Sequence, residues 1–422
     1  MSRLHAAALV TAMSLVPLTL PGQSVPPKDP QPNAASSPSS APEPTTSQDE
    51  AVRKEVERQM AEAQKNQKHW KFEVKPNGGG ISMTSPDEQL QFRLLGYAQA
   101  LGTLTNDDFV NSFETGDVRI RRARVDWLTT FQKKYELFIE YDGVPQTGNL
   151  VEARLNWQLR GDDLQVRAGK FVVPFSEEGW RSSRNYDTVE RFIVINSMYG
   201  LPSLDTQFGA MMHGQVLADN KLTYYVGFWN GNASASDNAR DSNGDKEVQA
   251  KIIYKFTPSF RAGLGLDHDV QEAQTLRLNS LTGTRFASID IRGERRGIDA
   301  DLFYEKKAVS LRAEVMQFDF SDRDADFGGG FLQFAYFIRG DYNAGFQPIV
   351  RIETARLQDN RAAGESANSR INAITAGFNW YLSNNVRFQV NAIAEDFNRS
   401  AGQNVQGDGM KSSLLTELQF RF

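Results

Sequence analysis

One long segment of the chain, residues 174–206, contains three arginines, Arg181, Arg184 and Arg191, together with several aromatic residues. A guanidinium group donates hydrogen bonds in a planar fork that matches phosphate and other oxyanions. Further cations occupy the polar positions of alternating segments elsewhere: Arg154, Arg167, Lys170 and Lys251. Groups of this kind attract and guide anions, so they predict an electrostatic site rather than a covalent one.

The sequence offers little else for catalysis or metal binding. It has no cysteine, which removes thiol chemistry and thiolate metal sites. The four histidines have no partner at a metal-binding or triad spacing: His5, His69, His213 and His268. Residues 241–246 have the carboxylate spacing of a calcium loop but lack its glycine, and Gly328-Gly329-Gly330 lacks the Lys-Ser/Thr of a phosphate-binding loop. We therefore expect no catalytic residues, no metal and no cofactor.

The elements that position the cations are alternating segments. In residues 151–160 the odd positions are apolar and the even positions are polar or charged, which is the pattern of a strand with one apolar face. Residues 248–256 and 386–392 repeat this pattern. In residues 118–125 the alternation breaks at Arg121-Arg122, which predicts a bulge or a rim position.

About sixteen such segments lie between residues 90 and 422, and the connections between them are alternately short and long. The longer ones are 105–116, 174–206, 231–245, 270–294, 358–369 and 398–409. An even strand number with loops sorted by length is typical of a bacterial transmembrane barrel. No run of about 18 apolar residues follows the N-terminus, which excludes transmembrane helices. The predicted fold class is all-β, a transmembrane antiparallel β-barrel of about 16 strands with a short N-terminal periplasmic helix.

The first 70 residues predict three further parts. Residues 1–24 carry a positive, an apolar and a small-residue region in the order of a secretory signal peptide. Residues 25–46 are rich in proline and serine and predict a linker. Residues 47–70 begin with a capping-box pattern and predict an amphipathic helix. This helix is either a self-associating coiled coil or a frayed, solvated helix.

Four segments in order resemble the phosphate-selective porins of the O and P type. They are residues 117–125 with Arg-Arg-Ala-Arg, 135–142, 166–176 with Gly-Lys-Phe and Pro-Phe, and 380–387. The resemblance extends over roughly residues 90–422. It implies a trimeric sixteen-stranded porin in the cell outer membrane, with a coiled coil in the periplasm of some members. The final Phe422 also resembles the insertion signal of outer-membrane proteins.

The same resemblance implies that Arg121, Arg122 and Arg124 join an arginine ladder along the pore wall, beside a constriction formed by residues 174–206. The expected solutes are small anions such as phosphate or polyphosphate. Outer-membrane lipid or lipopolysaccharide and two further copies of the chain are the expected partners, with possible peptidoglycan contact by the N-terminal helix. A pI near 5.6 argues against nucleic acid.

Two alternatives remain open from the residues themselves. Carboxylates share the polar face of the strands, and a mixed lining suits general diffusion as well as anion selection. They are Glu136, Glu140, Glu152, Glu247, Glu314, Glu353 and Glu395. An adhesin or an enzyme built on the barrel is the other alternative, although no nucleophile, base and orienting group occur together.

Overall fold

The fold is described from a computed structural model. It describes residues 47–65, 69–75, 78–107, 112–144, 150–198, 204–231, 244–283, 285–360, 367–399 and 409–422. The predicted signal peptide (1–24) and linker (25–46) lie outside the described residues.

The chain divides into two units, residues 1–67 and 68–422. The described part of the first unit is helix α1 (Ser47–Lys65), within the segment predicted to be helical. Val52 and Val56 are both exposed on this helix. No helix among the described residues is long and apolar enough to cross a membrane.

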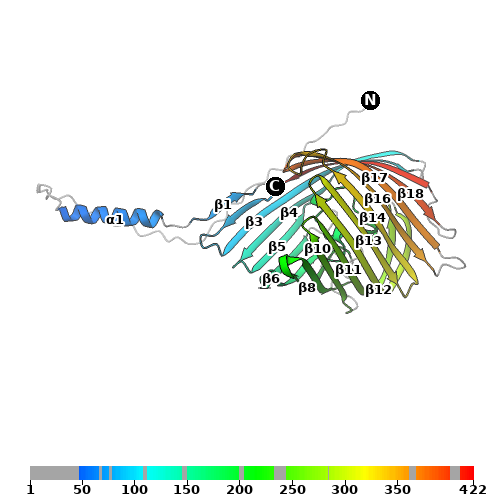
Figure 1. The fold of residues 1–422 in the computed structure, drawn as a ribbon, viewed down its shortest axis with the longest axis horizontal. Coiled ribbons are helices and arrows are strands. Elements are labelled where there is room, and N and C mark those ends of the chain that lie inside the picture. The colour runs from blue at the N-terminus through cyan, green and yellow to red at the C-terminus, as the bar shows by residue number, and fades with distance from the viewer. Residues whose placement is uncertain are drawn as a thin grey trace, which may run out of the picture. The chain divides into compact units, whose positions relative to one another are not determined.

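The second unit is a closed antiparallel barrel (Figure 1). Within the described residues sixteen strands form the ring, which confirms the predicted fold. They are β3 (Leu90–Asp107), β4 (Ser112–Phe131), β5 (Tyr135–Asp142), β6 (Leu150–Arg160), β7 (Leu164–Val172), β8 (Thr206–Val216), β9 (Leu222–Trp229), β10 (Glu247–Thr257), β11 (Phe260–Asn279), β12 (Arg285–Lys306), β13 (Val309–Phe320), β14 (Ala325–Tyr336), β16 (Gly345–Asp359), β17 (Ala367–Ser383), β18 (Val386–Arg399) and β19 (Gly409–Arg421).

The ring closes where β19 pairs with β3, in the register Phe420↔Ala98. Two short strands precede the barrel, β1 (Lys71–Val74) and β2 (Ile81–Thr84), and β2 adds to the start of β3. A two-residue strand, β15 (Arg339–Gly340), belongs to the turn before β16. Closure satisfies the backbone hydrogen bonds of every strand edge, which a wall in lipid requires.

Side-chain alternation along the strands confirms the predicted two faces. On β6, Leu155, Trp157 and Leu159 are exposed on the outside, whereas Asn156 between them is buried toward the lumen. The same order holds on β10, where Val248 and Ile252 point outward. The outside of the barrel is therefore an apolar band and the inside is polar, as a barrel in a bilayer requires.

One predicted loop is wrong. Residues 270–294 are not a long connection, because β11 continues to Asn279 and β12 begins at Arg285. In this extension the alternation is inverted: Leu276, Leu278 and Ile289 are buried inside, while polar side chains point outward. The sequence pattern of an apolar outer face is lost there because the strands extend beyond the apolar band.

A bulge on β4 explains the break in alternation at Arg121-Arg122. Gln99 of β3 pairs with Arg122, but the next residue, Ala100, pairs with Ile120, so Arg121 is an extra residue. The register shift leaves Arg121 and Arg122 both directed into the barrel, while Ile120 is exposed on the outside. The bulge thus adds one inward cation without reversing the faces of the strand.

Deleting Arg121 is expected to leave the barrel folded, because Ile120 stays outward when the ladder becomes regular. Deleting Ile120 instead is expected to place Arg121 on the lipid face, at a cost of about 2–4 kcal/mol near the bilayer midplane. Heat-modifiable gel mobility after refolding into lipid checks this difference. Equal refolding yields for the two deletions would show that the bulge does not set the facing of β4.

Candidate functional site

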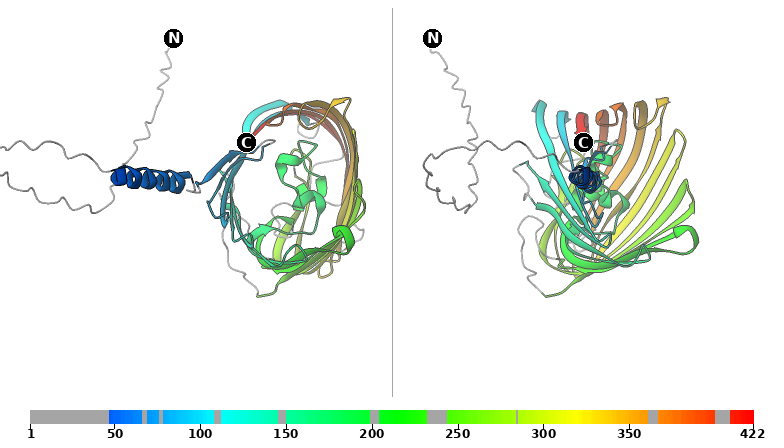
Figure 2. Two further views of the ribbon diagram at one scale, coloured as in Figure 1. Left: turned by 60° about the vertical axis from the view of Figure 1, so that its left-hand side comes forward. Right: turned by 90° about the vertical axis from the view of Figure 1, so that its left-hand side faces the viewer.

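The connection between β7 and β8 folds into the lumen of the barrel, where it appears as the green segment inside the ring of strands (Figure 2). Its described part contains α2 (Glu177–Trp180), the short helix η1 (Ser183–Asn185) and α3 (Ile193–Met198). The Ser176 hydroxyl caps α2 by accepting a hydrogen bond from the Gly179 N–H at 2.9 Å. We call residues 173–198 the lumen loop.

Apolar packing fixes the lumen loop to one side of the inner wall. Ile193, Val194 and Ile195 of α3 are fully buried, and α3 contacts β11, β14 and β16. The ring centroids of Phe192 and Phe331 are 5.1 Å apart in a T-shaped arrangement. Each aromatic pair of this kind adds about 0.5–1.5 kcal/mol to area burial, so the loop is held firmly.

Wall carboxylates bind the backbone of the lumen loop. Glu314 on β13 accepts the N–H of Glu178 at 3.0 Å, and Glu353 on β16 accepts the N–H of Ile193 at 2.8 Å. Both wall carboxylates are buried. These two acids, which the sequence placed on the pore face, are therefore covered by the loop instead of lining an open path.

Ion pairs reinforce this attachment. Arg351 on β16 donates to the Glu178 carboxylate at 2.7 Å, and Arg312 on β13 donates to Asp187 at 2.9 Å. Burial alone would raise the pKa of Asp187, but Arg312 and Arg181 outweigh it and lower the pKa to about 2. Asp187 is thus an anion at neutral pH and a fixed partner for the wall arginines.

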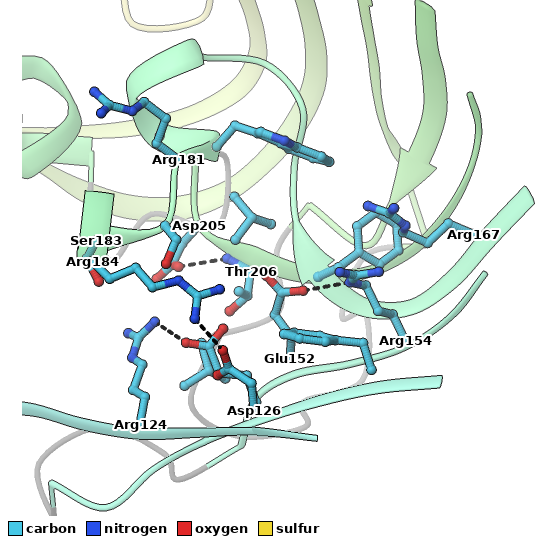
Figure 3. A pocket seen from close by; sticks show the side chains of 18 of the residues that line it. Arg124, Asp126, Glu152, Arg154, Arg167, Arg181, Ser183, Arg184, Asp205 and Thr206 are labelled. Atoms are coloured by element: carbon cyan, nitrogen blue, oxygen red, sulfur yellow. Dashed lines mark hydrogen bonds and ion pairs between the residues drawn. The ribbon is translucent and has the colours of Figure 1, made fainter. Parts of the chain in front are cut away.

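The opposite wall leaves open space, and a first cavity of about 230 Å³ lies between the lumen loop and strands β4 to β7 (Figure 3). Six arginines line it: Arg124, Arg154, Arg167, Arg181, Arg184 and Arg191. All six belong to the residues predicted from the sequence. The structure therefore brings together side chains from three strands and the loop.

Most arginines of the first cavity have a carboxylate partner. Arg124 binds Glu140 at 2.6 Å, and Arg184 of the loop binds Asp126 on β4 at 2.9 Å. Arg167 has no ion pair with any described residue, and its guanidinium lies 5.9 Å from the Trp180 ring centroid. Its guanidinium therefore lines this cavity without a direct carboxylate partner among the described residues.

A second cavity of about 570 Å³ lies on the long-loop side of the first, along β3, β4 and β19. Arg121 spans it to the lumen loop, donating to Glu190 at 2.7 Å and to the Val189 carbonyl at 2.9 Å. Arg122 donates to Gln99 at 2.9 Å and has no ion pair with any described residue. Arg191 lines both cavities and so links them.

Two predicted residues lie outside both cavities. Lys251 is buried between Asp299 and Asp301, at 2.9 and 2.6 Å, and also donates to the Phe175 carbonyl at 2.9 Å. Lys170 is buried and donates to the Leu150 carbonyl at 2.8 Å. Lys251 thus binds the backbone of the lumen loop, and Lys170 binds the backbone of the barrel wall.

Sequence reasoning missed other members of the site. Lys411 lines the second cavity, and Arg312, Arg351 and Arg387 hold the lumen loop. Arg351 and Arg387 stand at polar positions within alternating segments, so their inward direction was available from the sequence. Their role as loop anchors was not, because it depends on contacts between residues more than 150 positions apart.

A closed sixteen-strand barrel with an outer apolar band and a charged lumen narrowed by an internal loop is an outer-membrane porin, a channel rather than an enzyme. The family model of the phosphate-selective porins O and P matches residues 104–422. The chain belongs to that family. No curated protein matches the chain.

Solved porin structures share this fold. An anion-selective porin from Comamonas acidovorans superposes with a TM-score of 0.55 at 14% identity, over 79% of this chain and 100% of that one. The trimer form of OmpT from Vibrio cholerae superposes with a TM-score of 0.55 at 10% identity, over 79% of this chain and 99% of that one. The outer-membrane channel DcaP of Acinetobacter baumannii superposes with a TM-score of 0.51 at 11% identity, over 79% of this chain and 97% of that one. At such low identities the likeness concerns the fold.

Proposed function

We propose that this porin is a passive diffusion channel that favours small anions, with phosphate or polyphosphate as the preferred class. The observation that carries the proposal is the excess of cations in both cavities beside the lumen loop. Among described residues the second cavity is lined by five cationic and two acidic side chains. The first cavity is lined by six cationic and four acidic side chains of the described residues. A positive, narrow passage raises the local concentration of anions.

The engagement of two wall acids by the lumen loop supports this proposal over general diffusion. Glu314 and Glu353 bind loop backbone on one wall, whereas Arg122 and Arg167 face the cavities on the other. Guanidinium groups add a preference for oxyanions that take two parallel hydrogen bonds. Such groups at successive depths suit phosphate and extended phosphates better than a spherical halide.

The zero-current potential of the purified protein in a planar bilayer under a KCl gradient tests this proposal. We expect an anion-selective potential and a chloride current that added inorganic phosphate reduces. An ohmic channel with weak or cation preference would leave the alternative, a general diffusion porin on the same barrel. Absence of any conductance from folded, heat-modifiable protein would contradict both.

We also propose a homotrimer. OmpT of Vibrio cholerae, which shares the barrel fold, is described in a trimer form. Light scattering of the detergent-solubilised protein, corrected for bound detergent, is expected to give three times the chain mass. A monomeric mass would contradict this assembly without affecting the channel.

The N-terminal segments complete the proposal. Residues 1–24 direct secretion and are removed, and α1 lies in the periplasm. The exposed Val52 and Val56 support self-association of α1 into a coiled coil, with peptidoglycan contact as the alternative. N-terminal sequencing of the mature protein tests the first statement, and circular dichroism of a 47–70 peptide across a concentration series tests the second.

A further inference from the structure

A groove of about 760 Å³ lies on the outer wall of the barrel, over β13, β14, β16 and β17. Its floor is formed at Gly328 and Gly330 of β14, which offer no side chain at two successive outward positions. A Cβ atom at residue 328 would lie only 2.5 Å from the Met316 carbonyl oxygen. The Gln317 Oε1 would lie nearer still, so the close approach of β13 requires glycine here, and the Gln317 side chain covers Gly328 at this part of the groove.

The walls of this groove change from apolar to cationic along the barrel axis. Leu332 and Ile352 are exposed at one end and belong to the apolar band. Thr354 and Asn372 follow, joined by a hydrogen bond of 2.9 Å. Arg356 and Arg370 then line the end nearest the long loops.

The two arginines face each other directly, because Arg356 on β16 is the register partner of Arg370 on β17. Like charges at directly opposed positions destabilise a pair of strands. The nearest outward acids are Asp326, paired with Gln358, and Asp396, paired with Asn372. Neither forms an ion pair with the arginines, so within the described residues the two charges have no acidic partner.

The depth of the arginine pair identifies the layer that it faces. Long loops of such barrels are extracellular, and the arginines lie just beyond the apolar band on that side. Lipid phosphates lie at this boundary, immediately outside the acyl chains. Two unpaired guanidinium groups above an apolar hollow therefore match the charge and shape of a phosphorylated lipid.

We propose that the groove is a binding site for a phosphorylated lipid of the outer leaflet, lipopolysaccharide in an outer membrane. The phosphate accepts hydrogen bonds from both Arg356 and Arg370, and one acyl chain fills the hollow beside Gly330 and Thr354. A bridging phosphate removes the repulsion between the two guanidinium groups. A free phosphate ion would leave the hollow empty, and the cations face the lipid instead of the lumen.

The test uses the full-length protein in detergent, with hexa-acylated bisphosphorylated lipid A as the probe and native mass spectrometry as the readout. We expect Arg356→Gln with Arg370→Gln to weaken lipid A binding by about tenfold or more. Lipid A without its two phosphates is expected to bind the unchanged protein as weakly as bisphosphorylated lipid A binds the double variant. Thr354→Phe, which fills the hollow and leaves the charges unchanged, is expected to weaken binding as well.

Arg296→Gln is the matched control, because Arg296 also points outward but is paired with Glu294 at 2.7 Å. It is expected to bind lipid A like the unchanged protein. Equal binding by the double variant, or by phosphate-free lipid, would overturn the proposal. So would complete displacement of lipid A by millimolar inorganic phosphate, or a change of oligomeric state in place of lipid binding.

Folding of the variants provides a second check. Without lipid, Arg370→Gln is expected to raise the resistance of the barrel to urea, because it removes a repulsion between neighbouring strands. A loss of resistance in lipid-free detergent would show that Arg370 is already satisfied within the protein, and it would overturn the role given to the lipid phosphate. The single-channel conductance should stay unchanged in Arg370→Gln and in the double variant Arg356→Gln with Arg370→Gln.

Discussion

Replacing Arg122 and Arg167 together by glutamine is expected to remove most of the anion preference of the channel. These two cations lack ion pairs with described residues and lie in different cavities, so their charge is available at two depths of the passage. A unit charge acts on an ion about 4 Å away with about 1 kcal/mol even in water. That corresponds to roughly a fivefold change in local ion concentration for each charge.

The measurement is the chloride-to-potassium permeability ratio from zero-current potentials, which we expect to fall by about 25-fold when both charges are removed. Arg296→Gln is the control, since this arginine is on the outside of the barrel and should leave the ratio unchanged. A double variant that keeps the full anion preference would mean that the paired arginines set selectivity.

Replacing Arg351 by methionine is expected to release the lumen loop from its wall. This change leaves the Glu178 carboxylate buried without its closest cation. Breaking one side of a buried ion pair costs about 3–5 kcal/mol. The barrel itself depends on its strand ladder, so the penalty falls on the docking of the loop. We expect a single-channel conductance about twofold larger, more current noise, and weaker anion preference.

The companion variant carries Arg351→Met together with Glu178→Met. Because a buried pair can be replaced by apolar groups at little cost, this double variant is expected to restore a docked loop and a quiet current. Similar noise in the single and double variants would assign the effect of Arg351 to something other than its bond with Glu178.

Local alternation predicted the barrel, because each strand needs an apolar outer face and a polar inner face along its membrane-spanning part. The bulge at Arg121-Arg122 was also visible as a break in that pattern. The extension of β11 and β12 was not, since their faces invert beyond the apolar band. Leu276 and Leu278 look like an irregular loop in sequence, although they form the inner surface on which the lumen loop packs.

The cationic side chains of the site were largely predictable, whereas their functions were not. Strand parity placed Arg154 and Arg167 in the lumen, and both line the first cavity. The same alternation of inward and outward positions along a strand placed Lys251 in the lumen, where it is enclosed by Asp299 and Asp301. Whether an inward cation is available to a solute depends on which acids lie across the lumen, and those come from distant strands.

The apolar packing of the lumen loop against β11, β14 and β16 has a consequence for how solutes travel. A molecule crossing the barrel is displaced from the axis and moves along β4 to β7, with basic groups on that wall and the loop on its other side. With the anion preference proposed above, the negative end of the solute would turn toward the strands and its remaining atoms would lie against the loop. Solutes of equal size and charge should therefore pass at different rates when their charge sits at one end rather than in the middle.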